Sequence, residues 1–407
     1  MLLGAMLMAA AAGPVLHFDL QPGARPAEGR VAVAPDKSYE FGGFGYEPER
    51  RGKEFLFSAA VPEGNYRVTV RLGDHRAASR TTIKAESRRL MLADIATRPG
   101  KYATASFIVN VRTAALAAPP ANAPGGVIVK LKSREAGSYT WDDKLTLEFL
   151  GDPHVASIDI EPVDVPTVYL AGDSTVTDQR AEPAASWGQM FTAFFAPDVA
   201  IANHAESGET LKSFVTAHRL DKLLSGMKAG DWLLIQFGHN DQKEQWPQTY
   251  SDPKFAYPAW LRAFIAEARR RGAHPVLVTS PERRNFDQGR IRHTLAEYAE
   301  AMRKVARDEQ VPLIDLQTAT IALYEALGPD QSPLLFNEGG ADKTHHNNPG
   351  AWLLARAVAA GVATQVPALG AHLKPEFRSF DPARPPALDT INIAPSIAAS
   401  DVRPAGN

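Results

Sequence analysis

The sequence contains no cysteine. This absence excludes disulfide bonds, thiolate metal ligands and a cysteine nucleophile, and it leaves the cellular compartment undecided. An excess of charge of one sign is also lacking, because the formal net charge is -2 and the pI is near 6.6. Such a chain has no overall field that would attract nucleic acid or an anionic membrane, so we expect neither as a partner.

Long apolar runs are scarce as well. Beyond the first residues, no segment has the roughly 20 uninterrupted apolar residues that cross a bilayer. Residues 1–13 form an alanine-rich apolar run that resembles the hydrophobic core and cleavage region of a signal peptide, although positive charges are missing from it. We interpret residues 1–13 as a signal-peptide remnant and expect a secreted or periplasmic protein. The alternatives are that Met1 is a misassigned start or that the run leads into a core strand.

The length and composition indicate a folded chain with two domains. A chain of 407 residues exceeds the size at which single hydrophobic cores usually stop growing. With 44% hydrophobic and 22% charged residues, it also has the composition of an ordinary globular protein. The periodicity of the apolar residues differs between the two halves, which places the boundary near residue 165.

Short alternating apolar runs dominate residues 16–162, and turn-forming residues bound each run. This pattern predicts an all-β domain, an antiparallel sandwich or jelly roll. The alanine- and proline-rich stretch 114–126 is interpreted as a loop inside that domain. The predicted strands include Glu54–Ser58, Tyr66–Leu72, Ser106–Val111, Val127–Leu131 and Leu145–Phe149.

Residues 167–370 instead alternate short apolar strands with segments of helical periodicity, which is typical of a parallel sheet with crossover helices. From residue 371 to 407 proline recurs, and we interpret this tail as a surface wrap or a disordered segment. The predicted strands are Thr167–Ala171, Val199–Asn203, Trp232–Phe237, Pro275–Thr279 and Pro312–Asp315. The predicted helices are Trp187–Phe195, Leu211–Met227, Ala259–Arg271, His293–Glu309 and Pro349–Ala360.

A serine stands where the first of these strands ends. The strand runs directly into Gly172, Asp173 and Ser174. A serine at such a corner projects its hydroxyl into the crevice beyond the carboxyl ends of the strands, where a base can activate it as a nucleophile. Taken alone, a Gly-Asp-Ser run is more often an ordinary turn.

The next two strands end in candidate oxyanion donors. Gly208 follows the second strand and Asn240 follows the third. A glycine N–H, an asparagine amide and the N–H of Ser174 together can stabilise the oxyanion of an acyl-transfer reaction. The alternatives are a turn with positive φ at Gly208 and an Asx-turn or helix cap at Asn240.

The fourth cluster lies before the last predicted helix. Asp342 precedes His345 by three residues, a spacing that lets the carboxylate accept a hydrogen bond from Nδ1 while Nε2 takes the serine proton. A metal site is the less favoured interpretation, because His345 and His346 are adjacent and point in different directions. The sequence also has no His-Glu-x-x-His spacing. We therefore expect no metal and no organic cofactor, with His346 in packing or substrate contact.

These motifs carry a family resemblance. Residues 167–362 resemble the SGNH (GDSL-like) hydrolases, and in particular the rhamnogalacturonan acetylesterase branch. The resemblance implies a flavodoxin-like three-layer α/β fold, a catalytic triad of Ser174, Asp342 and His345, and an oxyanion hole formed by Ser174, Gly208 and Asn240. The segments that carry it are Gly172–Val176, Asn203–Ala205, Gln236–Gln242 and Asp342–His345.

One departure from this branch affects the expected substrate. Where the branch often shows Gly-Gly-Arg-Ser, this chain has the run 207–210, in which Glu209 replaces the cation. We expect this loop to hold a polyanionic, galacturonate-rich polymer less well. Residues 16–162 resemble the galactose-binding-like modules that precede some members of the family, a likeness of architecture only.

Other candidate substrate contacts are His239, His346 and Trp246. Mostly polar neighbours place Trp246 on an exposed loop, where an aromatic face can stack on a sugar ring. Trp187 and Trp260 are interpreted as residues at the edge of the core.

The sequence thus predicts a carbohydrate esterase that removes acetyl groups from a plant cell-wall polysaccharide or oligosaccharide, with no preference for an oligomeric state. The alternatives are a general esterase acting on lipid or aryl esters and a non-catalytic carbohydrate-binding protein.

Overall fold

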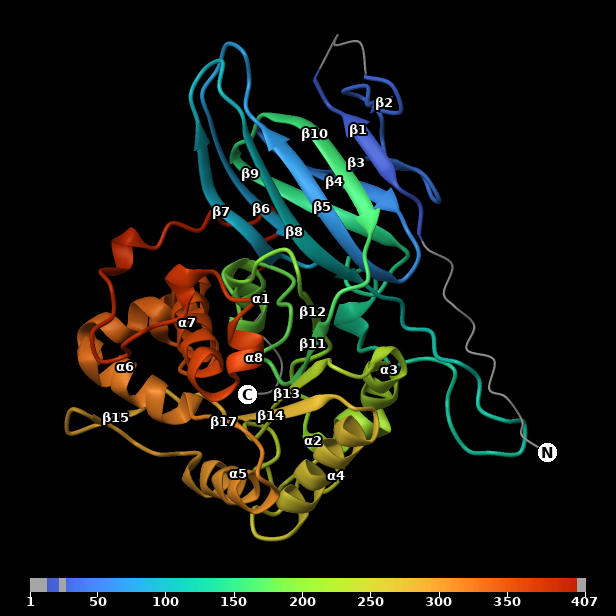
Figure 1. The fold of residues 1–407 in the computed structure, drawn as a ribbon. Coiled ribbons are helices and arrows are strands. Elements are labelled where there is room, and N and C mark those ends of the chain that lie inside the picture. Colours follow the sequence, from blue (N-terminus) through green and yellow to red (C-terminus); the bar gives the residue numbers. More distant parts are fainter. Residues whose placement is uncertain (1–12, 22–26, 401–407) are drawn as a thin grey trace.

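The computed structural model describes residues 13–21 and 27–400. The predicted signal-peptide remnant lies outside the described residues except for Gly13, and so do residues 401–407 of the predicted tail. Figure 1 shows an N-terminal β-sandwich standing on an α/β domain, so the predicted order of fold classes is confirmed.

The sandwich consists of two five-stranded sheets. Neighbouring strands are antiparallel, apart from the pair β1 and β2. Val68 and Val70 from one sheet and Leu147 and Phe149 from the other belong to one buried cluster between the sheets. The first sheet has the order β2 (Val31–Ala32), β1 (Leu16–Asp19), β10 (Val155–Pro162), β5 (Gly64–Leu72) and β8 (Ala103–Val111). The second has the order β3 (Phe44–Arg51), β4 (Glu54–Ala60), β9 (Lys144–Asp152), β6 (Ser79–Ala85) and β7 (Arg89–Thr97).

The predicted strand Val127–Leu131 is wrong. This segment forms only an isolated bridge between Ile128 and Ala115, and the main chain of Lys130 donates to the carbonyl of Ala217 in the α/β domain. Val127 and Ile128 are both exposed. The alternation of apolar residues is therefore present, but no neighbouring strand pairs with it.

The α/β domain is built on a parallel sheet with the strand order of a flavodoxin-like fold. Alternate residues of β11 face opposite sides: Val168 and Leu170 pack on one layer of helices, and Tyr169 and Ala171 pack on the other. The sheet order is β12 (Ala200–Asn203), β11 (Thr167–Gly172), β13 (Trp232–Gln236), β14 (His274–Val278) and β17 (Leu313–Ile314).

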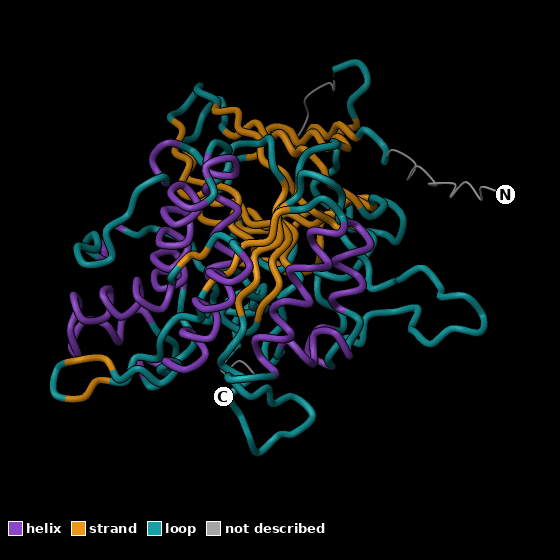
Figure 2. Tube along the Cα trace, turned by 60° about the horizontal axis from the view of Figure 1, so that its bottom comes forward, coloured by secondary structure: helices purple, strands orange, loops and turns teal. Residues whose placement is uncertain are grey.

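Helices cover both faces of this sheet, which gives the three-layer arrangement that Figure 2 shows around the central strands. One layer contains α1 (Trp187–Phe191), α6 (Leu316–Gln331) and α7 (Asn348–Gln365). The other contains α2 (Leu211–Thr216), α3 (Arg219–Gly226), α4 (Ala256–Arg270) and α5 (Ala296–Glu309). Smaller elements are β15 (Phe286–Asp287), β16 (Arg290–Ile291) and α8 (Pro367–Gly370).

Two helix predictions need correction. The segment predicted as one helix, Leu211–Met227, is two helices, because His218 adopts a left-handed backbone with φ of 61° between α2 and α3. Helix α6 was absent from the prediction, since its apolar residues do not form one stripe along the helix. No helix within residues 13–21 and 27–400 is long and apolar enough to span a membrane.

The two domains and the tail meet at buried charged residues. Glu182 of the α/β domain lies 2.5 Å from Arg88 and 3.2 Å from Lys84, both from the β6–β7 hairpin of the sandwich. The same carboxylate accepts a hydrogen bond of 2.7 Å from the main chain of Ser396 in the tail and one from Asn348 of α7. The described part of the tail therefore runs along the surface and returns to the sandwich (Figure 1).

Candidate active site

The corner that carries Ser174 is fixed by local contacts. A Cβ at Gly172 would lie 2.5 Å from a Val176 methyl carbon, so the turn requires glycine there. Asp173 is fully buried, and its Oδ1 accepts hydrogen bonds from Thr175 N (3.0 Å) and Thr175 Oγ1 (2.9 Å). The side chain of Gln179 donates to the carbonyl of Ser174 at 2.8 Å. These bonds hold the main chain on both sides of the serine hydroxyl.

The three residues predicted as a triad lie in one hydrogen-bonded line. His345 Nε2 is 2.9 Å from Ser174 Oγ, and His345 Nδ1 is 2.8 Å from Asp342 Oδ2. Asp342 Oδ1 also accepts the main-chain N–H groups of Thr344 and His345. Burial acts to raise the pKa of Asp342, but the hydrogen bond and charge of His345, together with these N–H groups, outweigh it and lower the pKa well below the ordinary value.

The predicted oxyanion donors follow three neighbouring strands. Ser174, Gly208 and Asn240 come after β11, β12 and β13, which are adjacent in the sheet and end at the same edge. Gly208 has φ of 77°, a left-handed conformation that favours glycine. The amide of Asn240 donates to the carbonyl of Glu209 at 3.1 Å and so links the two loops.

Two further buried groups support these loops. Asp241 accepts the main-chain N–H of Leu211 at 3.0 Å, and burial raises the pKa of Asp241 to about 8. Gln236 donates to Thr175 Oγ1 at 2.8 Å and accepts from the indole N–H of Trp187 at 2.7 Å. Asp241 and Gln236 stand within the predicted motifs, but no role was assigned to either from the sequence.

The candidate substrate contacts lie in different surroundings. His346 is 2% exposed, and its ring is enclosed by Phe336 and by Tyr324, whose hydroxyl is 2.7 Å from His346 Nε2. The structure therefore assigns His346 to packing instead of substrate contact. His239 is buried with Nδ1 3.4 Å from Asp173, and burial lowers its pKa.

Trp246 is 47% exposed on the loop after β13. The ammonium of Lys243 lies 4.8 Å from the centre of its indole ring. Trp187 is buried and Trp260 is half-buried against the helices, as expected for residues in and beside the core.

Glu209 has its charge balanced inside the protein. Its side chain is 2% exposed and lies 2.6 Å from the ammonium of Lys132, 3.6 Å from Arg219 and 2.5 Å from Ser213 Oγ. The expectation that this loop holds a polyanionic polymer less well stays a prediction. Lys132 belongs to the sandwich domain, and no local motif marks it in the sequence.

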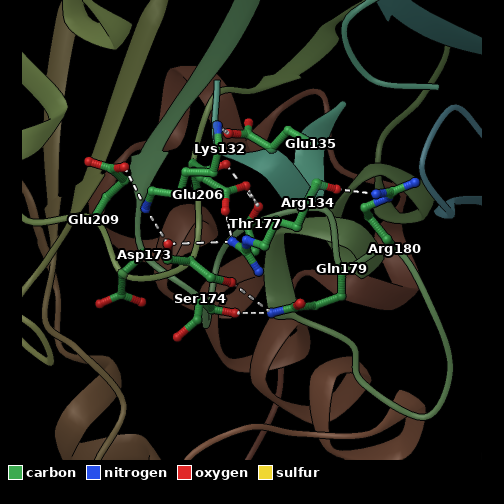
Figure 3. Close-up of polar contacts among 12 residues, drawn as sticks. Lys132, Arg134, Glu135, Asp173, Ser174, Thr177, Gln179, Arg180, Glu206 and Glu209 are labelled. Carbon is green, nitrogen blue, oxygen red and sulfur yellow. Dashed lines mark hydrogen bonds and ion pairs between the residues drawn. The ribbon is translucent and has the colours of Figure 1, made fainter. Parts of the chain in front are cut away.

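A cavity of about 420 Å³ lies beside the nucleophile corner, where the two domains and the tail meet. Figure 3 shows several of its side chains next to Ser174. Gln179 both lines this cavity and bonds the main chain of Ser174. The remaining lining residues come from the sandwich (Arg112, Arg134, Glu135, Ser138, Thr140, Trp141), the α/β domain (Thr177, Asp178, Arg180, Ala181, Ala184, Ala205, Glu206) and the tail (Ala398, Ser400).

Among the described residues, no three His, Asp or Glu side chains lie together in a way that could hold a metal ion. His345, which the sequence left as an alternative metal ligand, is engaged by Ser174 and Asp342.

Comparison with known proteins finds relatives of the α/β domain. The model of the GDSL-like lipase/acylhydrolase family matches residues 170–353. Rhamnogalacturonan acetylesterase RhgT of Bacillus subtilis (strain 168) is 46% identical over 209 residues, which are 48% of this chain and 88% of the relative. The probable rhamnogalacturonan acetylesterase YesY of the same strain is 35% identical over 198 residues, which are 48% of this chain and 91% of that relative. The crystal structure of YxiM from Bacillus subtilis is similar with a TM-score of 0.49 and 23% identity, over 86% of this chain and 99% of that chain.

Proposed function

We propose that this chain, which belongs to the GDSL-like lipase/acylhydrolase family, removes acetyl groups from rhamnogalacturonan or a similar pectic polysaccharide. The chain is an acetylesterase and a carbohydrate esterase. The observation that carries the proposal is the line from Asp342 through His345 to Ser174, with hydrogen bonds of 2.8 and 2.9 Å. The 46% identity to a rhamnogalacturonan acetylesterase supports the choice of polymer.

These residues hydrolyse an ester in two steps, through an acyl-enzyme on Ser174. His345 takes the proton of Ser174 as Oγ attacks the acetyl carbonyl, and Asp342 stabilises the imidazolium that forms. The N–H groups of Ser174 and Gly208 and the amide of Asn240 stabilise the oxyanion. His345 then donates the proton to the sugar oxygen, which leaves as a free hydroxyl while Ser174 keeps the acetyl group, and water activated by the same imidazole releases acetate.

The cavity next to the nucleophile corner, which is lined by Gln179 and by none of the triad residues, supports binding of a part of a saccharide that extends beyond the ester. Its lining offers hydroxyl, amide, guanidinium and carboxylate groups, which suit the many hydroxyls of a sugar chain. Cationic and anionic side chains occur there in equal number, so the charge of the lining does not by itself select uronic over neutral sugars. Trp246 is the exposed aromatic residue on which a further sugar ring stacks.

We also propose that the protein is secreted or periplasmic, because a cell-wall polymer lies outside the cytoplasm. The apolar run at residues 1–13 supports it. Mass analysis of the mature N-terminus after expression in a bacterial host tests this point. Retention of the whole run in the cytoplasmic fraction would contradict it.

The function is tested by measuring acetate release from acetylated rhamnogalacturonan, acetylated xylan and p-nitrophenyl esters of increasing chain length. We expect the largest kcat/KM on rhamnogalacturonan and a steep fall between acetyl and longer acyl groups. Ser174→Ala is the matched inactive control, since it removes only the nucleophilic oxygen. Higher activity on long-chain esters than on acetyl esters would refute the proposed substrate class.

A further inference from the structure

We infer that the sandwich domain supplies a positioning residue for the reaction, Lys132. Its ammonium binds the carbonyl of Ser207 and thereby directs the N–H of Gly208 toward the oxyanion. The inference rests on the oxyanion role proposed for Gly208 and extends the active site into the domain that carries no triad residue.

The contacts converge on one carbonyl oxygen. Lys132 Nζ is 2.6 Å from Ser207 O, and Arg134 Nη2 is 3.4 Å from the same atom. Ser207 is fully buried, so water does not compete freely for this carbonyl. Figure 3 shows Lys132 and Arg134 extending from the sandwich segment to the loop beside Ser174.

The peptide between Ser207 and Gly208 transmits this contact. A trans peptide is planar, so its carbonyl and the following N–H point in opposite directions. Fixing Ser207 O on the sandwich side therefore fixes the direction of Gly208 N–H on the other side. A cation at the carbonyl oxygen also polarises the peptide and makes that N–H a stronger donor.

The segment that carries Lys132 is itself held by the α/β domain. Glu135 accepts the main-chain N–H of Lys132 at 2.8 Å and is bound by the buried guanidinium of Arg219 on α3, with Nη1 at 3.1 Å. The indole of Trp141 donates to the same carboxylate at 2.9 Å. Lys132 also pairs with Glu209 at 2.6 Å, directly after the glycine, so the loop is held on both sides of Gly208.

Removal of the lysine should therefore weaken catalysis more than binding. Loss of a complete oxyanion donor costs about 100- to 1000-fold in kcat. A donor that is present but poorly directed should cost less, about 10- to 100-fold, with KM changed less than about threefold, because the interaction strengthens only in the transition state.

The experiment measures kcat and KM on p-nitrophenyl acetate, a substrate that does not depend on the identity of the polymer. Lys132→Met would leave Glu209 buried without its cation and could destabilise the fold. The decisive comparison is therefore the double variant K132M/E209Q against E209Q, with the melting temperature of each recorded. Lys132→Arg keeps a hydrogen-bond donor and a positive charge, so this variant should retain most of the wild-type kcat.

Lys130→Met is the matched control, because Lys130 is exposed two residues earlier in the same segment. We expect it to keep wild-type kinetics. If folded K132M/E209Q has the kcat of E209Q, or if only KM changes, Lys132 does not position the oxyanion peptide. If the wild type cleaves p-nitrophenyl acetate but no acetylated pectin, the proposed polymer is wrong. The role of Lys132 is still decided by the kcat values of the variants on p-nitrophenyl acetate.

Discussion

Replacement of Asp342 by Asn tests the triad with almost no change in shape. The Asn carbonyl can still accept the main-chain N–H groups of Thr344 and His345, which now bind Asp342 at 2.8 and 3.0 Å. The new amide then faces His345 Nδ1 and donates to it. The imidazole must in consequence carry its proton on Nε2, the atom 2.9 Å from Ser174 Oγ, where a lone pair is needed.

The expected loss in kcat is about 10⁴-fold, equivalent to about 5.4 kcal/mol of transition-state stabilisation. The melting temperature should change by only a few degrees, since the two hydrogen bonds from the main-chain N–H groups of Thr344 and His345 persist. The assay is steady-state hydrolysis of p-nitrophenyl acetate beside thermal unfolding, with Asp330→Asn on the surface as the control. A folded D342N enzyme within tenfold of the wild-type kcat would refute the argument that Asp342 sets the tautomer of His345.

Three further predictions concern the surrounding buried groups. Asn240→Ala should lower kcat for p-nitrophenyl acetate by about 100- to 1000-fold with little change in KM, and an effect on KM alone would make Asn240 a binding residue. Burial raises the pKa of Asp241 to about 8, so the folded protein keeps a proton that the unfolded chain releases above about pH 4. The free energy of unfolding should therefore fall as the pH rises from about 4 toward 8, by at most about 1.4 kcal/mol per pH unit. Urea unfolding at several pH values should show a weaker pH dependence for D241N than for the wild type. An equal pH dependence in the two proteins would contradict this reasoning. Glu182→Gln should lower the free energy of unfolding by about 3 kcal/mol, because Arg88 would lose its buried anion and Lys84 would keep only the more distant charge of Glu148. An effect below about 1 kcal/mol would show that water replaces the lost carboxylate.

The α/β domain was largely predictable because three of its four motifs follow a strand. Parallel strands end at one edge of their sheet, so Ser174, Gly208 and Asn240 had to approach one another once the strands were recognised. His345 and Asp342 follow no strand, and they were predicted as partners from their separation of three residues.

The sandwich was less predictable, for a physical reason. Strands β6 and β7 contain charged residues such as Lys84 and Arg89, which are fully buried against the α/β domain and interrupt the alternation of apolar residues. The strand predicted at Val127–Leu131 was wrong for the opposite reason. Its apolar residues alternate, but alternation does not make a strand where no neighbouring strand pairs with the segment. The contact of Lys132 with Ser207 spans 75 positions and two domains, and neither periodicity nor motif reports such a contact.

The ion pair between Lys132 and Glu209 has a consequence for how this chain can evolve. In the branch that it resembles, the loop often has arginine where this chain has Glu209, and a lysine from the sandwich would meet that arginine with repulsion. The two positions are therefore expected to change together in descendants and relatives. Exchange of the sandwich between family members by recombination should therefore require opposite charges on the incoming segment and the recipient loop, in addition to the pairs that Glu182 and Arg219 make across the same boundary.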